Sequence, residues 1–132
     1  MIDLHLHTTA SDGRLSPSEL VARTAAAGLT TISVTDHDTV AAIAEVRRHA
    51  AAYRIVVVPG IEVTSVHEGR DVHILGYFFD ELDSALAQFL ERQRSHRIDR
   101  ARAIAERLSR LGVPIDIDGL LGQTASNPGA SV

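Results

Sequence analysis

The chain has 132 residues, the size of one ordinary domain, and its 45% hydrophobic and 23% charged residues exclude wholesale disorder. Thirteen basic residues, all of them arginine, stand against seventeen acidic residues, so a global basic field that would coat an extended nucleic-acid duplex is excluded. The absence of cysteine excludes disulfides, thiolate zinc sites and cysteine nucleophiles. No secretory signal pattern and no apolar run near ~18 residues occurs, so we expect a cytoplasmic protein with no membrane partner.

Strand and helix signals alternate at the start of the chain. Apolar and polar residues alternate over Met1–His7, which predicts a strand with one polar face. The segment Ser16–Glu19 has the composition of a capping box and predicts a helix that ends at Gly28. The β-branched run Thr30–Thr35 then predicts a second strand.

A second helix and three further strands follow. Asp38 or Thr39 is expected to cap a helix that reaches about Ala52. The strands expected after it are Ile55–Val58, Ile61–Val66 beyond Pro59-Gly60, and Asp71–Phe79 beyond a hairpin turn at His67–Arg70. Strands that alternate with helices at this spacing predict an α/β sheet with right-handed crossovers.

The composition changes after Asp80, and this divides the chain into an α/β part (residues 1–80) and a helical segment (residues 81–132). Leu82–Leu111 follows one long helical pattern, about 45 Å if unbroken at ~1.5 Å per residue, and Gly112-Val113-Pro114 stops it. The tail Asp116–Val132 is short of apolar residues. Since such a long helix has little to pack against here, we expect the chain to be part of a longer protein.

Six side chains with metal-ligating chemistry occur in consecutive strands or strand ends. They are His5, His7, Asp12, His37, Glu62 and His73. Residues two apart in a strand project from one face, so the first two imidazoles can meet one cation. Each residue alone has an ordinary alternative, such as a surface histidine or a turn aspartate. Together they predict one site at the carboxyl edge of the sheet, where imidazole and carboxylate ligands without thiolate suit zinc, manganese or iron.

Other polar residues near these segments have less specific interpretations. Asp36 and Asp38 flank His37 and are candidates either for helix caps or for partners that orient the imidazole. His49 and His67 fall on a predicted helix and in a predicted turn, and we interpret both as surface residues.

The motifs resemble a known family. His5–Gly13, Thr35–Thr39, Pro59–Thr64 and His73–Tyr77 are similar, in order and spacing, to the first half of a PHP (polymerase and histidinol phosphatase) domain. The resemblance runs from Met1 to about Pro114 and is nearest to the branch with nucleoside 3′,5′-bisphosphate phosphatases and 5′-to-3′ exoribonucleases. It implies the N-terminal part of a distorted (β/α)7 barrel of parallel strands, with the start of a helical insertion domain.

The resemblance also implies a ligand set for up to three divalent ions, manganese foremost, with zinc or iron as alternatives. In this scheme His5, His7 and Glu62 hold one metal. Asp12 and His37 belong to a second, and His73 with bridging Glu62 to a third. The family completes these sites with a histidine and an aspartate–histidine motif near the C-terminus, which this sequence lacks, so we expect the N-terminal half of a longer enzyme.

The long helix carries candidate phosphate ligands. Arg97 falls on its mostly apolar stripe, where a guanidinium requires an anionic partner, and Arg94 and Arg100 strengthen the local field. Guanidinium binds phosphate bidentately, and the family resemblance implies a phosphate-binding arginine on this helix. We interpret the remaining arginines of the helix as a solvated face: Arg92, Arg102, Arg107 and Arg110.

The activity that follows from the resemblance is metal-dependent phosphoester hydrolysis. The expected partners are nucleoside 3′,5′-bisphosphates or the 5′ ends of short RNA. Two alternatives remain open at this point. One is a phosphatase for another small metabolite such as histidinol phosphate. The other, for a chain of this length, is a metal-binding module without turnover.

Overall fold

The computed structural model describes residues 1–125, which form a mixed α/β fold. The elements in chain order are β1 (Ile2–Leu6), α1 (Pro17–Ala26), β2 (Thr31–Val34), α2 (Ile43–Ala50), the 3-10 helix η1 (Ala51–Tyr53), β3 (Val56–His67), β4 (Arg70–Tyr77), α3 (Ser84–Arg110) and α4 (Ile117–Ala125). The predicted α/β class is confirmed. No helix among these residues combines the length and apolar composition needed to span a bilayer.

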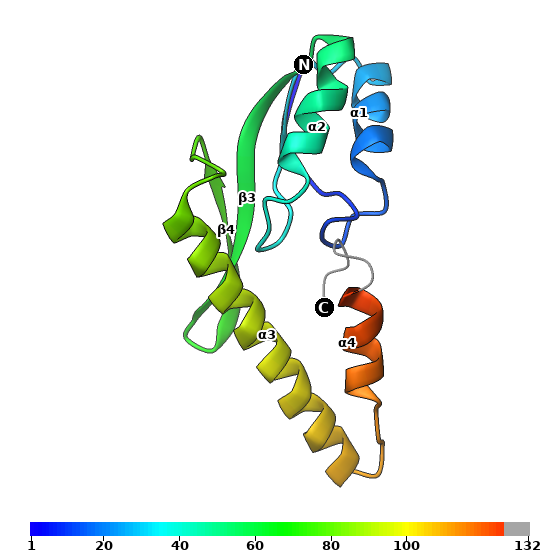
Figure 1. The fold of residues 1–132 in the computed structure, drawn as a ribbon, viewed down its shortest axis with the longest axis vertical. Helices are drawn as coiled ribbons and strands as arrows, with labels where there is room; N and C mark the ends of the chain where they lie inside the picture. Colours follow the sequence, from blue (N-terminus) through cyan, green and yellow to red (C-terminus); the bar gives the residue numbers. More distant parts are fainter. Residues whose placement is uncertain (126–132) are drawn as a thin grey trace.

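The strands form one curled sheet in the order β1-β2-β3-β4 (Figure 1). β1 pairs with β2 and β2 pairs with β3 in parallel, as the crossover argument predicted. β4 returns antiparallel to β3 and forms the predicted hairpin. The carboxyl ends of the three parallel strands therefore meet at one edge of the sheet.

The third and fourth predicted strands are one continuous strand, so the predicted break at Pro59-Gly60 is wrong. The first part of β3 pairs with β2 as far as Pro59, and the rest, from Gly60 on, pairs with β4. Pro59 lacks an N–H, but its carbonyl still accepts a hydrogen bond from the N–H of Phe78 at 3.0 Å. The chain thus passes from one pairing partner to the other without leaving the extended conformation.

Helices α1 and α2 cover one face of the sheet (Figure 1). The core lies between them and the strands, and its fully buried members include Val21, Ile32, Val34 and Val46. The predicted capping box is present, because Ser16 Oγ accepts from the N–H of Glu19 while the Glu19 carboxylate accepts from the N–H of Ser16 at 2.9 Å. This face of the sheet therefore belongs to the core, and the polar side chains must lie on the other.

The start of α2 differs from the prediction. Neither Asp38 nor Thr39 caps it, since the helix begins at Ile43 after Ala42, which makes no side-chain cap hydrogen bond. Asp38 has a left-handed backbone (φ 51°), and its carboxylate accepts from the N–H of Thr64. The carboxylate is used in a tertiary contact and is not available to the helix.

The long predicted helix is present as α3, about 40 Å long at ~1.5 Å per residue, and it runs obliquely across β4 and away from the sheet (Figure 1). Asp83 caps it by accepting from the N–H of Leu86 at 2.9 Å. The tail carries the helix α4, which its sequence pattern did not predict, and the rest of that tail lies outside the described residues. α4 packs back against α3.

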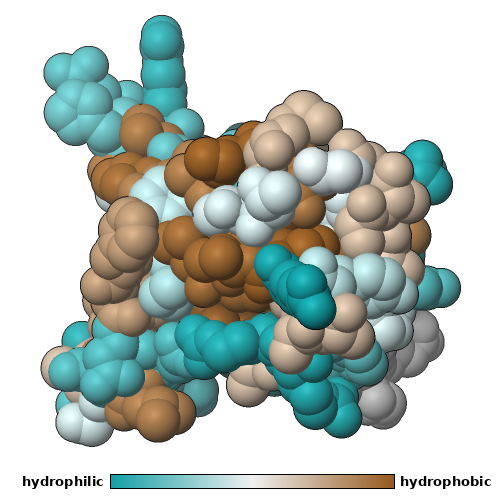
Figure 2. Space-filling model, turned by 90° about the horizontal axis from the view of Figure 1, so that it is seen from above, coloured by the Kyte–Doolittle hydropathy of each residue, from teal (hydrophilic) through white to brown (hydrophobic). Residues whose placement is uncertain are grey.

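Apolar surface remains exposed at the end of the molecule near the N-terminus. Figure 2 looks onto this end and shows apolar side chains gathered in the middle of the face. Large apolar residues at the starts of β1 and β3 are exposed, among them Met1, Ile2 and Val56. The sheet therefore buries its apolar side chains incompletely within residues 1–125.

Gly60 is required where β3 lies close to the end of its neighbour β2. A Cβ there would lie 2.9 Å from Thr35 Cγ2 and closer still to Ser33 Oγ. Both neighbours are buried, so they cannot move aside easily. We expect Gly60→Ala to destabilise the chain by about 1–3 kcal/mol through overpacking, measured by urea unfolding followed by circular dichroism.

Gly122→Ala is the matched control. A Cβ at Gly122 meets no atom within 4 Å, and alanine favours a helix, so its unfolding free energy should stay unchanged or rise. Equal unfolding midpoints for the Gly60→Ala variant and the parent chain would contradict the packing argument.

Candidate metal centre

The six predicted ligand residues lie together at the carboxyl edge of the sheet. They come from six places in the chain: β1 (His5), the residue after β1 (His7), the β1–α1 loop (Asp12), the loop after β2 (His37), β3 (Glu62) and β4 (His73). The alternation of β1 points His5 and His7 to the same side of the strand. Register places His73 opposite Thr64, on the same face of the hairpin as Glu62. Local strand geometry and sheet order together assemble the cluster.

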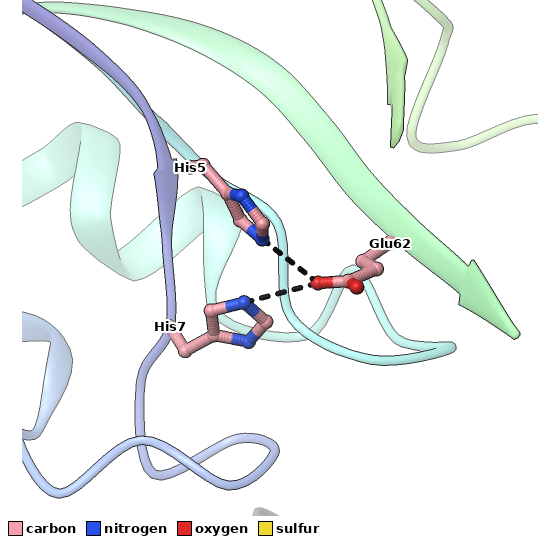
Figure 3. Close-up of side chains that lie close together, drawn as sticks. All are labelled: His5, His7 and Glu62. Atoms are coloured by element: carbon pink, nitrogen blue, oxygen red, sulfur yellow. Dashed lines mark hydrogen bonds and ion pairs between the residues drawn. The ribbon is translucent and has the colours of Figure 1, made fainter. Parts of the chain in front are cut away.

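Glu62 is the centre of this cluster, and Figure 3 shows it together with His5 and His7. Its Oε2 atom lies 3.0 Å from Nε2 of His5 and 3.1 Å from Nε2 of His7. Its Oε1 atom lies 2.6 Å from Nδ1 of His73. The residue is only 5% exposed, so its carboxylate is almost entirely surrounded by protein.

Asp12 and His37 extend the cluster on the side of His7. Asp12 Oδ1 lies 3.2 Å from His7 Nδ1, and Asp12 Oδ2 lies 3.6 Å from His37 Nε2. The His37 ring is 4.8 Å from the His7 ring and 4.9 Å from the His73 ring, measured between centroids. With His5, whose ring is 5.2 Å from that of His7, four imidazoles follow one another along the edge.

Three overlapping sets of ligand atoms result, and within each set the atoms lie within 4.8 Å of one another. The sets are His5, His7 and Glu62; His7, Asp12 and His37; and His37, Glu62 and His73. The first matches the set implied by the family resemblance. The geometry adds His7 to the pair Asp12–His37, and it adds His37 to the pair Glu62–His73.

The donor set fits divalent cations better than it fits hydrogen bonds alone. One oxygen, Glu62 Oε2, faces the Nε2 atoms of three imidazoles, with His37 at 3.9 Å, and a carboxylate oxygen has two lone pairs for them. Nitrogen and oxygen ligands without sulfur suit zinc, manganese or iron. Divalent metal binding is therefore what this constellation supports.

Glu62 is held in its charged form. Burial by itself raises the pKa of Glu62, but the hydrogen bonds with His5 and His73 and the nearby His37 outweigh burial and hold the pKa below the ordinary carboxyl value. The carboxylate is consequently ionised at neutral pH and available as an anionic ligand.

A buried carboxylate, Asp36, fixes the loop that carries Asp12. Asp36 Oδ1 accepts from the N–H of Thr8 at 2.7 Å and from the hydroxyl of Ser11 at 2.6 Å. Asp36 Oδ2 accepts from the Thr8 hydroxyl at 2.6 Å. The helix-cap interpretation of Asp36 is wrong, and its role is to hold the turn between His7 and Asp12 in place.

Tyr77 is a supporting residue that the sequence analysis did not identify. Its hydroxyl donates to the carbonyl of Leu4 at 2.8 Å, which joins β4 to β1 across the concave face, next to His5. Burial, then the nearby carboxylates of Glu62 and Asp3, raise the pKa of Tyr77, so the phenol stays a donor. A tyrosine in a strand pattern carries no signal of such a contact.

The predicted arginines differ in their surroundings. Arg97 forms an ion pair with Asp38, so the anionic partner that its position requires is supplied by the chain itself. Arg100 contacts Asp71, with both nitrogen–oxygen distances at 3.3 Å. Arg94 lies exposed on α3.

The two histidines interpreted as surface residues lie outside the cluster. As expected, His67 is exposed. His49 lies partly exposed on α2, 3.4 Å from a surface glutamate, Glu45.

A cavity of about 430 Å³ connects the cluster to α3. Its lining consists of Asp12, His37, Thr64, Asp71, His73, Arg97, Arg100, Ala101 and Ile104. Gln93, one turn before Arg97, donates from Nε2 to the carbonyl of Thr64 at 3.1 Å and holds this part of the helix against β3. A molecule in the cavity would touch candidate metal ligands on one side and arginines on the other.

Comparison with known proteins places this geometry in a family. Among curated relatives, a 5′-3′ exoribonuclease of Haemophilus influenzae is 41% identical over 117 residues, which cover 89% of this chain and 43% of that protein. A 3′,5′-nucleoside bisphosphate phosphatase of Chromobacterium violaceum is 40% identical over 121 residues, covering 91% of this chain and 42% of that protein. The chain therefore spans less than half the length of these relatives.

A solved structure shows the same arrangement of the chain. It is an amidohydrolase from Chromobacterium violaceum with bound sulfate and no metal, which aligns with a TM-score of 0.79 and 37% identity over 91% of this chain and 42% of that one. The PHP domain family itself matches residues 3–101, a range that contains all six residues of the cluster. On this match the chain belongs to the PHP domain family.

Proposed function

We propose that this chain is the metal-binding part of a phosphoesterase that hydrolyses nucleoside 3′,5′-bisphosphates or trims the 5′ ends of short RNA. The observation that carries the proposal is the six-residue cluster beside a cavity lined by Arg97 and Arg100. Relatives named for both activities support this substrate class. A single phosphorylated end fits a cavity of about 430 Å³, whereas a duplex surface would need a broad basic face.

The metal ligands in this proposal are the six residues of the cluster, and manganese is the ion we propose for them. Divalent ions, when bound, supply Lewis-acid polarisation of a phosphoryl oxygen and a lowered pKa for an attacking water. The protein's own part is to hold anionic Glu62 among the imidazoles and to keep the Asp12 turn fixed through Asp36. These groups need not reorganise when the substrate arrives.

We propose Arg97 and Arg100 as the ligands of a substrate phosphate, and exposed Arg94 as a contributor to the positive electrostatic potential around them. Asp38 and Asp71 hold the two guanidinium groups at the cavity before substrate is present. A phosphate that enters the cavity replaces the exposed Asp71 carboxylate at Arg100 and contacts Arg97 beside Asp38, and guanidinium groups bind phosphate bidentately. The Chromobacterium violaceum structure holds a sulfate, which is a tetrahedral anion like phosphate.

The proposal extends to the architecture of the longer relatives. Residues 1–80 would form part of a distorted seven-stranded barrel, and residues 81–132 would begin a helical segment over its mouth. The histidine and aspartate–histidine motif that the family supplies near its C-terminus are not in this sequence. A cytoplasmic location also stays a prediction.

Metal binding by the cluster depends on Glu62 in this scheme. We expect Glu62→Gln to weaken binding of Mn²⁺ and Zn²⁺ by at least about 100-fold in isothermal titration, because the amide loses the charge that two of the three ligand sets share. Glu45→Gln on the surface of α2 is the control and should leave the affinity unchanged. Equal affinities for the parent chain and the Glu62→Gln variant would refute the ligand assignment.

The 132-residue chain by itself should release phosphate from nucleoside bisphosphates slowly or not at all. The reason is that the ligands expected near the family's C-terminus are absent, so the coordination of the ions is incomplete. A colorimetric phosphate assay with added Mn²⁺ tests this. Fast turnover that EDTA abolishes, in a preparation free of other phosphatases, would contradict it.

Arg97 should contribute more to nucleotide binding than a solvated arginine of the same helix. We expect Arg97→Ala to weaken binding of adenosine 3′,5′-bisphosphate to the Mn²⁺-loaded chain by roughly 10- to 150-fold, corresponding to ~1.5–3 kcal/mol for a charged hydrogen-bond partner. Arg107→Ala, on the exposed part of α3, should have little effect. Small, equal losses at both positions would show that Arg97 does not bind the nucleotide.

A further inference from the structure

The cavity beside the metal cluster has an apolar end. Seven of its nine lining residues are charged, imidazole or hydroxyl side chains, and the other two are Ala101 and Ile104 on α3. Ile104 is 51% exposed, although the next residue, Ala105, is buried. Packing within residues 1–125 thus leaves half of a large aliphatic side chain uncovered, beside a strongly polar cavity. We name Ala101 and Ile104 the aliphatic shelf.

The shelf and the arginines share one side of α3 in a fixed order. Arg97, Ala101 and Ile104 are spaced by four and three residues, which places them in one stripe along an α-helix. Arg97 to Ile104 spans about 10 Å at ~1.5 Å per residue. The stripe therefore runs from charge to aliphatic surface over the length of a small organic molecule.

Contacts with the sheet fix which end of the stripe faces the metal cluster. Gln93 contacts Thr64, the residue opposite His73 in the hairpin. Arg97 contacts Asp38, which directly follows His37. The charged end of the stripe is thereby tied to the neighbours of two cluster histidines, and the aliphatic shelf begins one helical turn farther on.

We propose that the aliphatic shelf binds the nucleoside moiety of a phosphorylated nucleotide whose phosphates lie against the arginines and the metal cluster. This inference rests on the proposed function and adds the part of the substrate that the shelf recognises. A ligand that is anionic at one end and a flat, uncharged heterocycle at the other matches the order of side chains along the stripe. A bare phosphate or a short sugar phosphate would leave Ile104 in contact with water.

The chemistry of the shelf also sets its selectivity. None of the nine lining residues is phenylalanine, tyrosine or tryptophan, and the shelf itself offers methyl groups but no side-chain hydrogen-bond donor or acceptor. The binding free energy from aliphatic contact depends on the apolar area that is buried, and such contact does not recognise the hydrogen-bonding groups of a base. The site should therefore distinguish a nucleotide from a phosphate but hardly distinguish one base from another.

The test follows the isoleucine δ1 methyl groups of the Zn²⁺-loaded 132-residue chain by carbon–proton NMR. Three probes are titrated: adenosine 3′,5′-bisphosphate, uridine 3′,5′-bisphosphate and inorganic phosphate. We expect the Ile104 methyl signal to shift with both nucleotides and not with phosphate. The two nucleotides should bind within about fivefold of each other, and adenosine bisphosphate should bind at least about tenfold tighter than phosphate.

Variants identify the shelf residue. Ile104→Ser should weaken adenosine bisphosphate about 5- to 20-fold and leave phosphate affinity unchanged, whereas Ile104→Leu should restore nucleotide binding. Ile115→Ser removes another exposed isoleucine outside the cavity lining and should change neither affinity. The methyl spectrum of the remaining isoleucines shows whether each variant is folded.

The outcomes separate this inference from the proposed function. If phosphate binds but adenosine bisphosphate binds no tighter, and the Ile104 methyl does not shift, the shelf assignment is overturned while the phosphate chemistry stands. If neither probe binds the Zn²⁺-loaded chain, the proposed function fails and the inference fails with it. An Ile104 shift that follows protein concentration in place of nucleotide concentration would show that a second copy of the chain covers the shelf, and it would overturn the proposal.

Discussion

A buried, ionised carboxylate is the constraint on which this structure depends. Glu62 is almost completely enclosed, and an enclosed carboxylate is costly unless cations or donors surround it. Imidazoles from β1, from the loop after β2 and from β4 meet that requirement. Each of these segments must therefore reach the same point in space. The curl of the sheet, the β3–β4 register and the contact of Tyr77 with β1 all serve this convergence.

The apolar core and the polar cluster occupy opposite faces of the same strands. α1 and α2 bury one face with Val21, Ile32 and Val46, and this fixes the parallel order of the first three strands. Parallel order brings the strand ends that carry His7 and His37 to one edge. Asp36 connects the two regions, since it is buried two residues after the end of β2 and holds the Thr8–Ser11 turn through three hydrogen bonds. Packing energy gained on one face thus positions ligands on the other.

Helix α3 is joined to the sheet through polar contacts that can exchange partners. Arg47 binds Glu81 just before the helix begins, and this hydrogen bond lowers the pKa of Glu81. Farther along, Arg97 contacts Asp38 and Arg100 contacts Asp71. The Arg100–Asp71 pair is exposed to solvent and contributes little net stability, so an incoming anion can replace this carboxylate without disrupting a core. The same helix can therefore be part of the fold and part of a binding surface.

The sequence by itself determined the α/β class, the family, the capped start of α1, the extent of α3 and the six residues that meet at the sheet edge. The capped start of α1 and the extent of α3 depend on local rules, since capping and helical periodicity act over a few residues. The family and the six residues were identified from motifs whose order and spacing extend from His5 to His73. Only the tertiary structure decided the continuity of β3 through Pro59-Gly60, the loss of Asp38 as a helix cap, the loop-holding role of Asp36 and the pairing of Arg97. Arg97 and its partner are 59 positions apart in the chain. The sequence shows that an arginine on the apolar side of a helix requires an anionic partner. Which carboxylate becomes that partner depends on which distant residue the folded chain brings close to it.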